Sequence, residues 1–134
     1  MITAVDTNIL LDILLPNEKF FDRSQRALET AAAAGSLVIC DLVYAELCVH
    51  FESQAICDEF LSDVDIHTEA LGRPASFLAS RVWRSYRRQG GPRERILADF
   101  LIGAHAQLQA SRLLGSDRGF YRRMFPALRL MQPA

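Results

Sequence analysis

The sequence lacks a long apolar stretch, and its few cysteines are not spaced as a framework. No segment approaches the roughly 20 apolar residues of a membrane-spanning helix, and the first residues lack the positive charge that begins a secretory signal. The three cysteines are an odd number without a C-x-x-C pair, which argues against a disulfide framework or a structural zinc site. We therefore expect a cytoplasmic protein with no membrane contact and reduced, mostly buried thiols.

Lysine is also scarce, because Lys19 is the only one beside fourteen arginines. The net charge of −1 on its own argues against a dedicated nucleic-acid binder. The arginines are nevertheless concentrated, with six of them and one glutamate at positions 81–95. Guanidinium groups suit phosphate contacts, but a solvated helix face or a surface that pairs with acidic residues explains the cluster equally well.

What is present is typical of one globular domain. The chain has 134 residues, of which 50% are hydrophobic and 23% charged, and we expect a single domain over residues 1–134. Short apolar runs alternate with helical patterns. Strands are expected at 2–5, 37–39, 64–66, 113–114 and 128–131, and helices at 7–15, 18–34, 41–51, 54–61, 74–88 and 93–109. A short turn or helix is expected at 119–125.

This alternation predicts an α/β fold, a three-layer α/β/α sandwich with a mainly parallel central sheet. Asp41 is expected to cap the helix at 41–51. Trp83 and Tyr86 are expected to pack in the core rather than to stack on bases. In such sheets ligands bind beyond the carboxyl ends of the strands, where the strand order switches.

Two carboxylates directly follow expected strands. Asp6 comes after residues 2–5, and Asp117 stands in a turn just after residues 113–114. Each also has an ordinary explanation, Asp6 as a helix N-cap and Asp117 as a turn residue.

Two further carboxylates lie on apolar helix faces. Glu46 shares a face with Val43 and Leu47, and Asp99 is the one acid of the run 96–104. A buried carboxylate without a partner costs several kcal/mol, so a cation, a metal or hydrogen-bond donors should lie opposite. An exposed helix edge at Glu46, or an ion pair between Arg95 and Asp99, is the alternative.

In a parallel sheet these four positions can converge on one crevice. Clustered carboxylates must either take up protons or bind cations. Ligands that are all oxygen favour Mg²⁺ or Mn²⁺ over zinc, and such a metal suits the hydrolysis of a phosphodiester.

The residues around these acids resemble the successive motifs of PIN domains, in particular the VapC ribonuclease toxins of bacterial toxin–antitoxin pairs. The resemblance extends along essentially the whole chain. It rests on four segments in order, which are 5–12 (VDTNILLD), 43–47 (VYAEL), 98–106 (ADFLIGAHA) and 116–120 (SDRGF).

The resemblance implies an Mg²⁺- or Mn²⁺-dependent endoribonuclease on an α/β/α fold, usually a homodimer and inhibited by an antitoxin. Asp6, Glu46, Asp99 and Asp117 match the acidic metal site and would be the catalytic residues. Thr7, Asn8 and Ser116 match polar positions beside that site, where they would orient ligands or water. A fifth acid of many relatives is replaced by Gly119.

Three arginines are candidates for binding RNA. Arg118 stands next to an expected metal ligand, and Arg84 and Arg88 belong to the cluster on the helix at 74–88. They would offset the repulsion between the acids and RNA phosphates, or else meet acidic residues of the antitoxin.

Two other functions compete with the nuclease. One is a catalytically weak PIN-like domain that acts as a binding partner or scaffold. The other is an aspartate-based phosphotransfer module, which we disfavour because Asn8 stands where a phosphatase of this kind has a second acid, and because a receiver module needs a lysine late in the chain.

Overall fold

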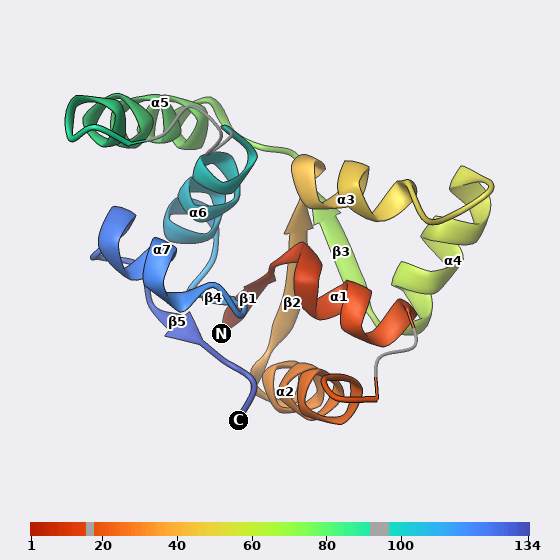
Figure 1. The fold of residues 1–134 in the computed structure, drawn as a ribbon. Helices are drawn as coiled ribbons and strands as arrows, with labels where there is room; N and C mark the ends of the chain where they lie inside the picture. Colours follow the sequence, from red (N-terminus) through yellow and green to blue (C-terminus); the bar gives the residue numbers. More distant parts are fainter. Residues whose placement is uncertain (16–17, 92–96) are drawn as a thin grey trace.

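Five parallel strands form the centre of the fold (Figure 1). The computed structural model describes residues 1–15, 18–91 and 97–134. The strands run in the order β3-β2-β1-β4-β5, and every neighbouring pair is parallel. They are β1 (Ile2–Val5), β2 (Ser36–Cys40), β3 (Ile66–Glu69), β4 (Arg112–Leu114) and β5 (Leu130–Met131).

The strands form here because their residues are apolar on both faces. In β1 and β2 every residue after the first is buried, as expected for strands covered by helices on both sides. At the start of β2 the chain passes close to the N-terminus. A Cβ on Gly35 would lie 1.8 Å from the carbonyl oxygen of Met1, so only glycine fits at this position.

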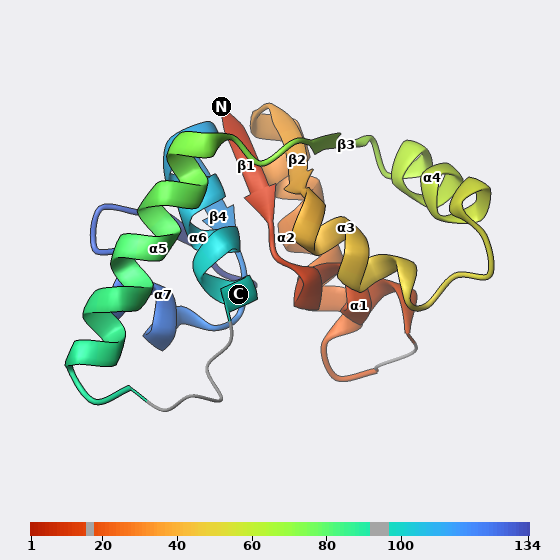
Figure 2. The same cartoon turned by 90° about the horizontal axis from the view of Figure 1, so that it is seen from above.

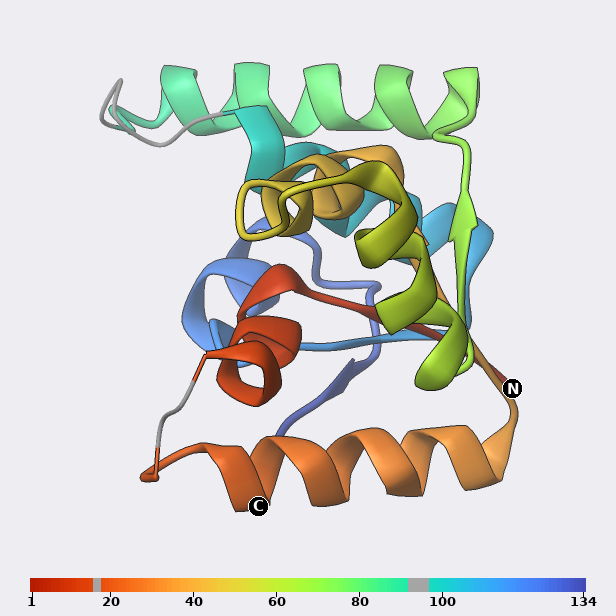
Figure 3. The same ribbon diagram turned by 90° about the vertical axis from the view of Figure 1, so that its right-hand side faces the viewer.

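The helices connect the strands and cover both faces of the sheet. They are α1 (Thr7–Leu14), α2 (Phe21–Ala34), α3 (Asp41–Cys48), α4 (Gln54–Asp63), α5 (Arg73–Arg88), α6 (Leu97–Gln109) and α7 (Arg118–Met124). Figure 2 shows α5, α6 and α7 on one side of β1, with α1, α3 and α4 on the other. In Figure 3, α5 and α2 form opposite outer sides of the molecule. The predicted three-layer α/β/α sandwich is confirmed.

Two expected boundaries differ because of local geometry. The third strand begins at Ile66 and not at Val64, since Asp65 adopts a left-handed backbone conformation (φ 55°) that no strand continues through. The cap of α3 is Cys40 and not Asp41. The Asp41 carboxylate instead accepts a hydrogen bond from the backbone N–H of Leu71, at 3.2 Å.

The outer helix α5 is amphipathic. Ala75, Ala79 and Tyr86 are buried, and the helix packs on α6. Tyr86 therefore lies in the core as predicted. The same prediction for Trp83 is wrong, because Trp83 is 38% exposed on a helix that only one neighbour covers closely.

The strand order determines where a site can form. From β1 the chain moves outward to β2 and β3, then returns to place β4 on the other side of β1. The switch in strand order therefore lies between β1 and β4. Their carboxyl ends are held together, since the backbone N–H of Asp6 donates to the carbonyl of Leu114 at 2.9 Å. Ligands of parallel α/β sheets bind at such a point.

The described ranges can be compared with what was expected of membrane spans and of the cysteines. None of their helices is both long and apolar enough to cross a membrane. All three cysteines are free thiols, and Cys40 and Cys57 are buried. The sulfur atoms of Cys48 and Cys57 lie 3.7 Å apart.

Candidate active site

Asp6 lies at the switch point, held on both of its carboxylate oxygens. It is the N-cap of α1 and is only 7% exposed. Its Oδ1 accepts from the backbone N–H of Thr7 at 2.7 Å, and its Oδ2 accepts from the hydroxyl of Tyr121 at 3.0 Å. The predicted capping role is thus present, and the hydroxyl from α7 adds a second donor that a cap does not need.

The pKa of Asp6 reports what surrounds it. Burial raises this pKa from 3.8 to about 6, and the charges of Asp99 and Glu46 raise it as well. The hydrogen bonds from Tyr121 and Thr7 act in the opposite direction. Carboxylates from α3 and α6 are therefore close enough to repel Asp6.

Glu46 enters the site from α3. Its Oε1 accepts from the Thr7 hydroxyl at 2.7 Å, so Thr7 binds Asp6 through its backbone and Glu46 through its side chain. Of the two alternatives for Glu46, the exposed helix edge is the one observed. Val43 and Leu47 are buried, whereas Glu46 is exposed.

Asp99 and Asp117 approach from the other side. Asp99 is in the first turn of α6 and is half-buried, and Asp117 is the exposed N-cap of α7. The pKa of Tyr121 is raised well above its ordinary range, first by burial and then by the charges of Asp6, Asp99 and Asp117. The hydroxyl of Tyr121 thus lies near three of the four predicted acids.

Tyr121 is a site residue that was not predicted from the sequence. The available signal was its position four residues after Asp117 in a helix, a spacing that places two side chains on one face. Its hydroxyl is almost fully enclosed, since the residue is 2% exposed. Tyr121 is therefore a buried donor aimed at the carboxylate of Asp6.

The other predicted polar residues differ in their surroundings. The side-chain oxygen Oδ1 of Asn8 is buried and has no hydrogen-bond partner within the described ranges. Ser116 is exposed beside Asp117. Gly115 gives Asp6 its space, because a Cβ there would lie 3.2 Å from the Asp6 Cβ and 3.3 Å from its Oδ2.

The donor set has the chemistry of a hard-cation site. The four acids offer only oxygen atoms, which suit Mg²⁺ or Mn²⁺. In residues 1–15, 18–91 and 97–134, however, no three Asp, Glu, His or Cys side chains are grouped closely enough to hold a metal ion.

The predicted arginines are not brought to the acids. Arg84 and Arg88 are exposed on the outer helix α5, and neither forms an ion pair with an acid among the described residues. The side chain of Arg118 lies outside the part that the structure describes, as do Arg93 and Arg95.

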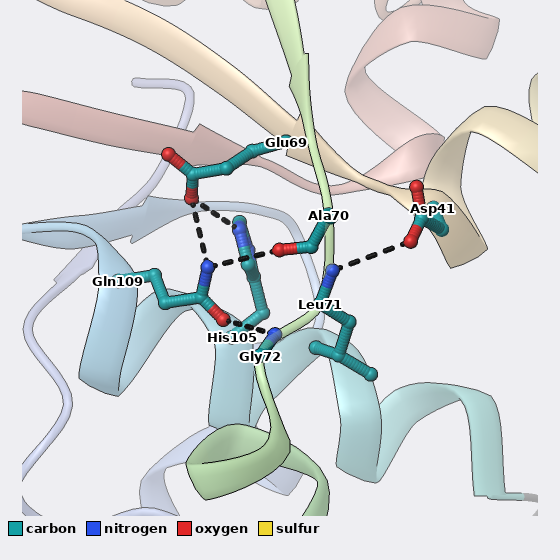
Figure 4. A network of polar contacts seen from close by, with 7 residues as sticks. All are labelled: Asp41, Glu69, Ala70, Leu71, Gly72, His105 and Gln109. Carbon is teal, nitrogen blue, oxygen red and sulfur yellow. Dashed lines mark hydrogen bonds and ion pairs between the residues drawn. The ribbon is translucent and has the colours of Figure 1, made fainter.

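The buried histidine serves a separate network (Figure 4). His105 Nε2 on α6 lies 2.9 Å from Glu69 Oε1 at the end of β3. Gln109 donates to the same oxygen at 3.2 Å and accepts from the backbone N–H of Gly72 at 2.8 Å. These contacts tie the edge strand and the start of α5 to α6, so His105 is engaged in structure and not in the acidic site.

Solved structures share this fold. A chain in VapBC2 from Rickettsia felis bound to a promoter DNA fragment matches with a TM-score of 0.74 at 22% identity, covering 98% of each chain. Chains in VapBC-1 from nontypeable Haemophilus influenzae and in a toxin–antitoxin complex from Klebsiella pneumoniae match with TM-scores of 0.70, at 17% and 18% identity, again covering 98% of each chain.

At the level of sequence, no curated protein matches this chain. The PIN domain, by contrast, matches residues 3–125, which is nearly the whole chain and includes all four acids. This chain therefore belongs to the PIN domain family.

Proposed function

We propose that this protein is a Mg²⁺- or Mn²⁺-dependent endoribonuclease that hydrolyses phosphodiester bonds in RNA. One observation carries the proposal. At the switch point of a parallel sheet, Asp6 and Tyr121 form a buried hydrogen-bonded pair. Glu46, Asp99 and Asp117 lie close enough for their charges to raise the pKa of one or both members of this pair. Membership of the PIN domain family, whose nucleases are hydrolases, supports the same reaction class.

Asp6, Asp99 and Asp117 would hold the cation, and Glu46 would complete the ligand set or orient the attacking water. When bound, such a cation lowers the pKa of a coordinated water and offsets charge on the phosphate. The chain's own donors prepare this arrangement. Thr7 and Tyr121 hold the carboxylate of Asp6, and the Thr7 hydroxyl occupies one oxygen of Glu46, leaving the other to accept a hydrogen bond from water.

This chemistry predicts the ends of the products. Water attacks the phosphorus directly and the 3′ oxygen leaves, so the products carry a 5′-phosphate and a 3′-hydroxyl. No 2′-hydroxyl acts as nucleophile. A histidine base is not required either, and the buried His105 is already bonded to Glu69.

Incubation of the purified protein with structured RNAs in Mn²⁺ tests the proposal. We expect cleavage by the natural protein and a loss of at least about 100-fold in Asp99→Asn, because this change removes a charged ligand. Asp63→Asn, an exposed change on α4, is the matched control and should cleave normally. Cleavage that persists in excess EDTA, or products with a 2′,3′-cyclic phosphate, would contradict the mechanism.

We further propose that the protein is the toxin of a type II toxin–antitoxin pair and binds a cognate antitoxin. The fold is shared with chains in VapBC2 and in the Klebsiella pneumoniae toxin–antitoxin complex.

In such a pair, Arg84 and Arg88 would contact RNA phosphates or acidic residues of the antitoxin. The toxin role is tested by expressing the protein in cells, where we expect growth arrest that the protein from the neighbouring gene relieves. If Arg84→Gln and Arg88→Gln leave the affinity for both RNA and antitoxin unchanged, these arginines contact neither partner. We expect a homodimer, which light scattering measures.

One observation favours the alternative of a catalytically weak PIN domain that acts as a binding partner. Within the described ranges no three of the acids lie close enough together to hold a metal ion. If the RNA is bound but left intact in both Mg²⁺ and Mn²⁺, this alternative replaces the nuclease.

A further inference from the structure

A second polar site lies between α5 and α7, where no predicted catalytic residue is found. A hollow of about 260 Å³ is lined by Arg81, Val82, Ser85, Gln89, Arg123 and Met124. An adjoining hollow of about 240 Å³ shares Gln89, Arg123 and Met124 and continues toward Tyr86 and Gly91. Together they form one groove, which we call the α5–α7 groove. Figure 2 shows α7 beside the C-terminal half of α5.

The polar groups of this groove suit an anion. Arg81 comes from α5 and Arg123 from α7, so each of the two helices contributes an arginine to the lining. Among the described residues, no carboxylate forms an ion pair with either of them. Between them, the amide of Gln89 donates to the hydroxyl of Ser85 at 3.3 Å. Guanidinium, hydroxyl and amide groups are the usual donors to phosphate oxygens.

An exposed aromatic ring lies beside Arg81, outside the lining of the groove. The guanidinium of Arg81 covers one face of the ring of Phe77, 4.5 Å from its centroid. Phe77 is 59% exposed and lines a neighbouring hollow with Arg73, Pro74 and Ser76. An exposed ring beside cations is the combination by which proteins bind single-stranded nucleic acid, with bases stacked on the ring and phosphates held by the cations. A purely acidic peptide would not use the ring.

Helix α7 connects the groove to the acids. Its Tyr121 donates to Asp6 on one side, and its Arg123 and Met124 line the groove on the other. An α-helix is about 10 Å across, so the groove begins roughly one helix diameter from Asp6. A substrate phosphate at four carboxylates is repelled, and cations along the flanking strand offset that repulsion.

We infer that the α5–α7 groove binds the phosphate backbone of a single-stranded RNA segment that flanks the cleavage point, with Arg81 and Arg123 as its phosphate contacts and Phe77 as a stacking surface. This inference rests on the proposed ribonuclease function and extends it. It assigns the RNA contact to one groove made by two helices, not to the arginine cluster of α5 as a whole.

The test measures RNA binding without cleavage. A short fluorescent single-stranded RNA is titrated, over a range of salt concentrations, into protein that carries Asp99→Asn. The variant Arg81→Gln/Arg123→Gln should bind more weakly and lower the slope of log K against log salt by about 1.4, which is about 0.7 for each phosphate that is no longer neutralised. Arg23→Gln/Arg26→Gln removes two charges from the opposite helix α2 and should leave the slope unchanged. Circular dichroism confirms that each variant is folded.

An unchanged slope in Arg81→Gln/Arg123→Gln overturns the inference. So does an equal fall in the α2 control, which would reflect net charge alone. If the groove variant loses affinity for a glutamate-rich peptide but not for RNA, the groove is a protein-docking site and the inference is wrong. Cleavage by the natural protein is assayed separately. If the natural protein cleaves RNA but the slope of the groove variant is unchanged, only the groove inference is wrong. If the slope is lowered but the natural protein does not cleave RNA, only the proposed ribonuclease activity is wrong.

Discussion

Asp6 combines a fixed position with an unfavourable charge. Two donors hold its carboxylate, yet burial and two neighbouring acids raise its pKa to about 6. A residue needed only as a helix cap would not require a second donor from a distant helix. Burial and the neighbouring acids disfavour the ionised form of Asp6, so an aspartate here does not serve stability. Its presence is better explained by a function that needs a negative charge at this point.

The free energy of unfolding should depend on pH through Asp6. Its folded pKa is raised above its ordinary value of 3.8, so its contribution to stability is fully present below about pH 4 and is lost as the pH rises through about 6. Asp6→Asn is never charged. Its one oxygen can still accept from the backbone N–H of Thr7, and its amide NH2 group can donate to the hydroxyl oxygen of Tyr121, which now accepts. In EDTA above about pH 7 we expect it to raise the free energy of unfolding by up to about 3 kcal/mol, and by little below about pH 4.

Urea denaturation at several pH values measures this difference. The exposed Asp63→Asn is the control, and its effect should not grow with pH in this way. If the effect of Asp6→Asn is the same at every pH, folding does not raise the pKa of Asp6 and the prediction is wrong.

At the scale of elements, the glycines of α6 and α7 differ in the space around them. A Cβ on Gly103 of α6 would lie 2.5 Å from a ring carbon of Phe125, which directly follows α7. At Gly119 of α7 a Cβ would meet nothing within 4 Å. Gly103 is therefore needed for close packing, whereas Gly119 is not needed for space.

This contrast predicts opposite effects of the same substitution. Gly103→Ala should lower the free energy of unfolding by about 1–3 kcal/mol, because the ring of Phe125 must move in a packed core. Gly119→Ala should raise it by up to about 1 kcal/mol, because alanine favours the helix. Chemical denaturation of the two variants checks both signs. Equal effects would mean that the ring of Phe125 yields freely.

At the scale of the whole molecule, the acids come from separate parts of the chain. Asp6 follows β1, Glu46 is on α3, Asp99 on α6 and Asp117 at the start of α7. The proposed cation would be held by these elements together, so it would bind the folded chain and not the unfolded one. Its binding free energy therefore adds to the stability of the entire fold.

Thermal unfolding measures this linkage. We expect Mn²⁺ at about 100 times its dissociation constant to stabilise the natural protein by about 2.7 kcal/mol, and EDTA to reverse the effect. Asp99→Asn should lose most of the gain. A rise in Tm that is the same in both proteins would show that the metal binds elsewhere.

Much of the fold was predictable because it depends on local patterns. The apolar runs of β1, β2 and β4 are buried strands, and the small and apolar residues at one face of α5 pack on α6. Some of the wrong predictions concern the choice between neighbouring helix faces. Trp83 and Glu46 are exposed, since a helical pattern does not say how far the next element covers an edge. The start of β3 and the cap of α3 were also predicted wrongly, because they depend on the backbone conformation of Asp65 and on the contact of Asp41 with Leu71.

Most elements and the four candidate carboxylates could be identified from the order of residues alone. Apolar periodicity, an acid at the end of a strand and an acid on an apolar helix face are all properties of neighbouring positions. The hydrogen-bond partners of those acids could not be identified in this way. The hydroxyl of Tyr121 reaches Asp6 across 115 positions, and Thr7 reaches Glu46 across 39. The groove with Arg81 and Arg123 likewise joins two helices that are far apart in the chain. Such contacts depend on how helices pack over the sheet, and packing is a property of the folded molecule as a whole.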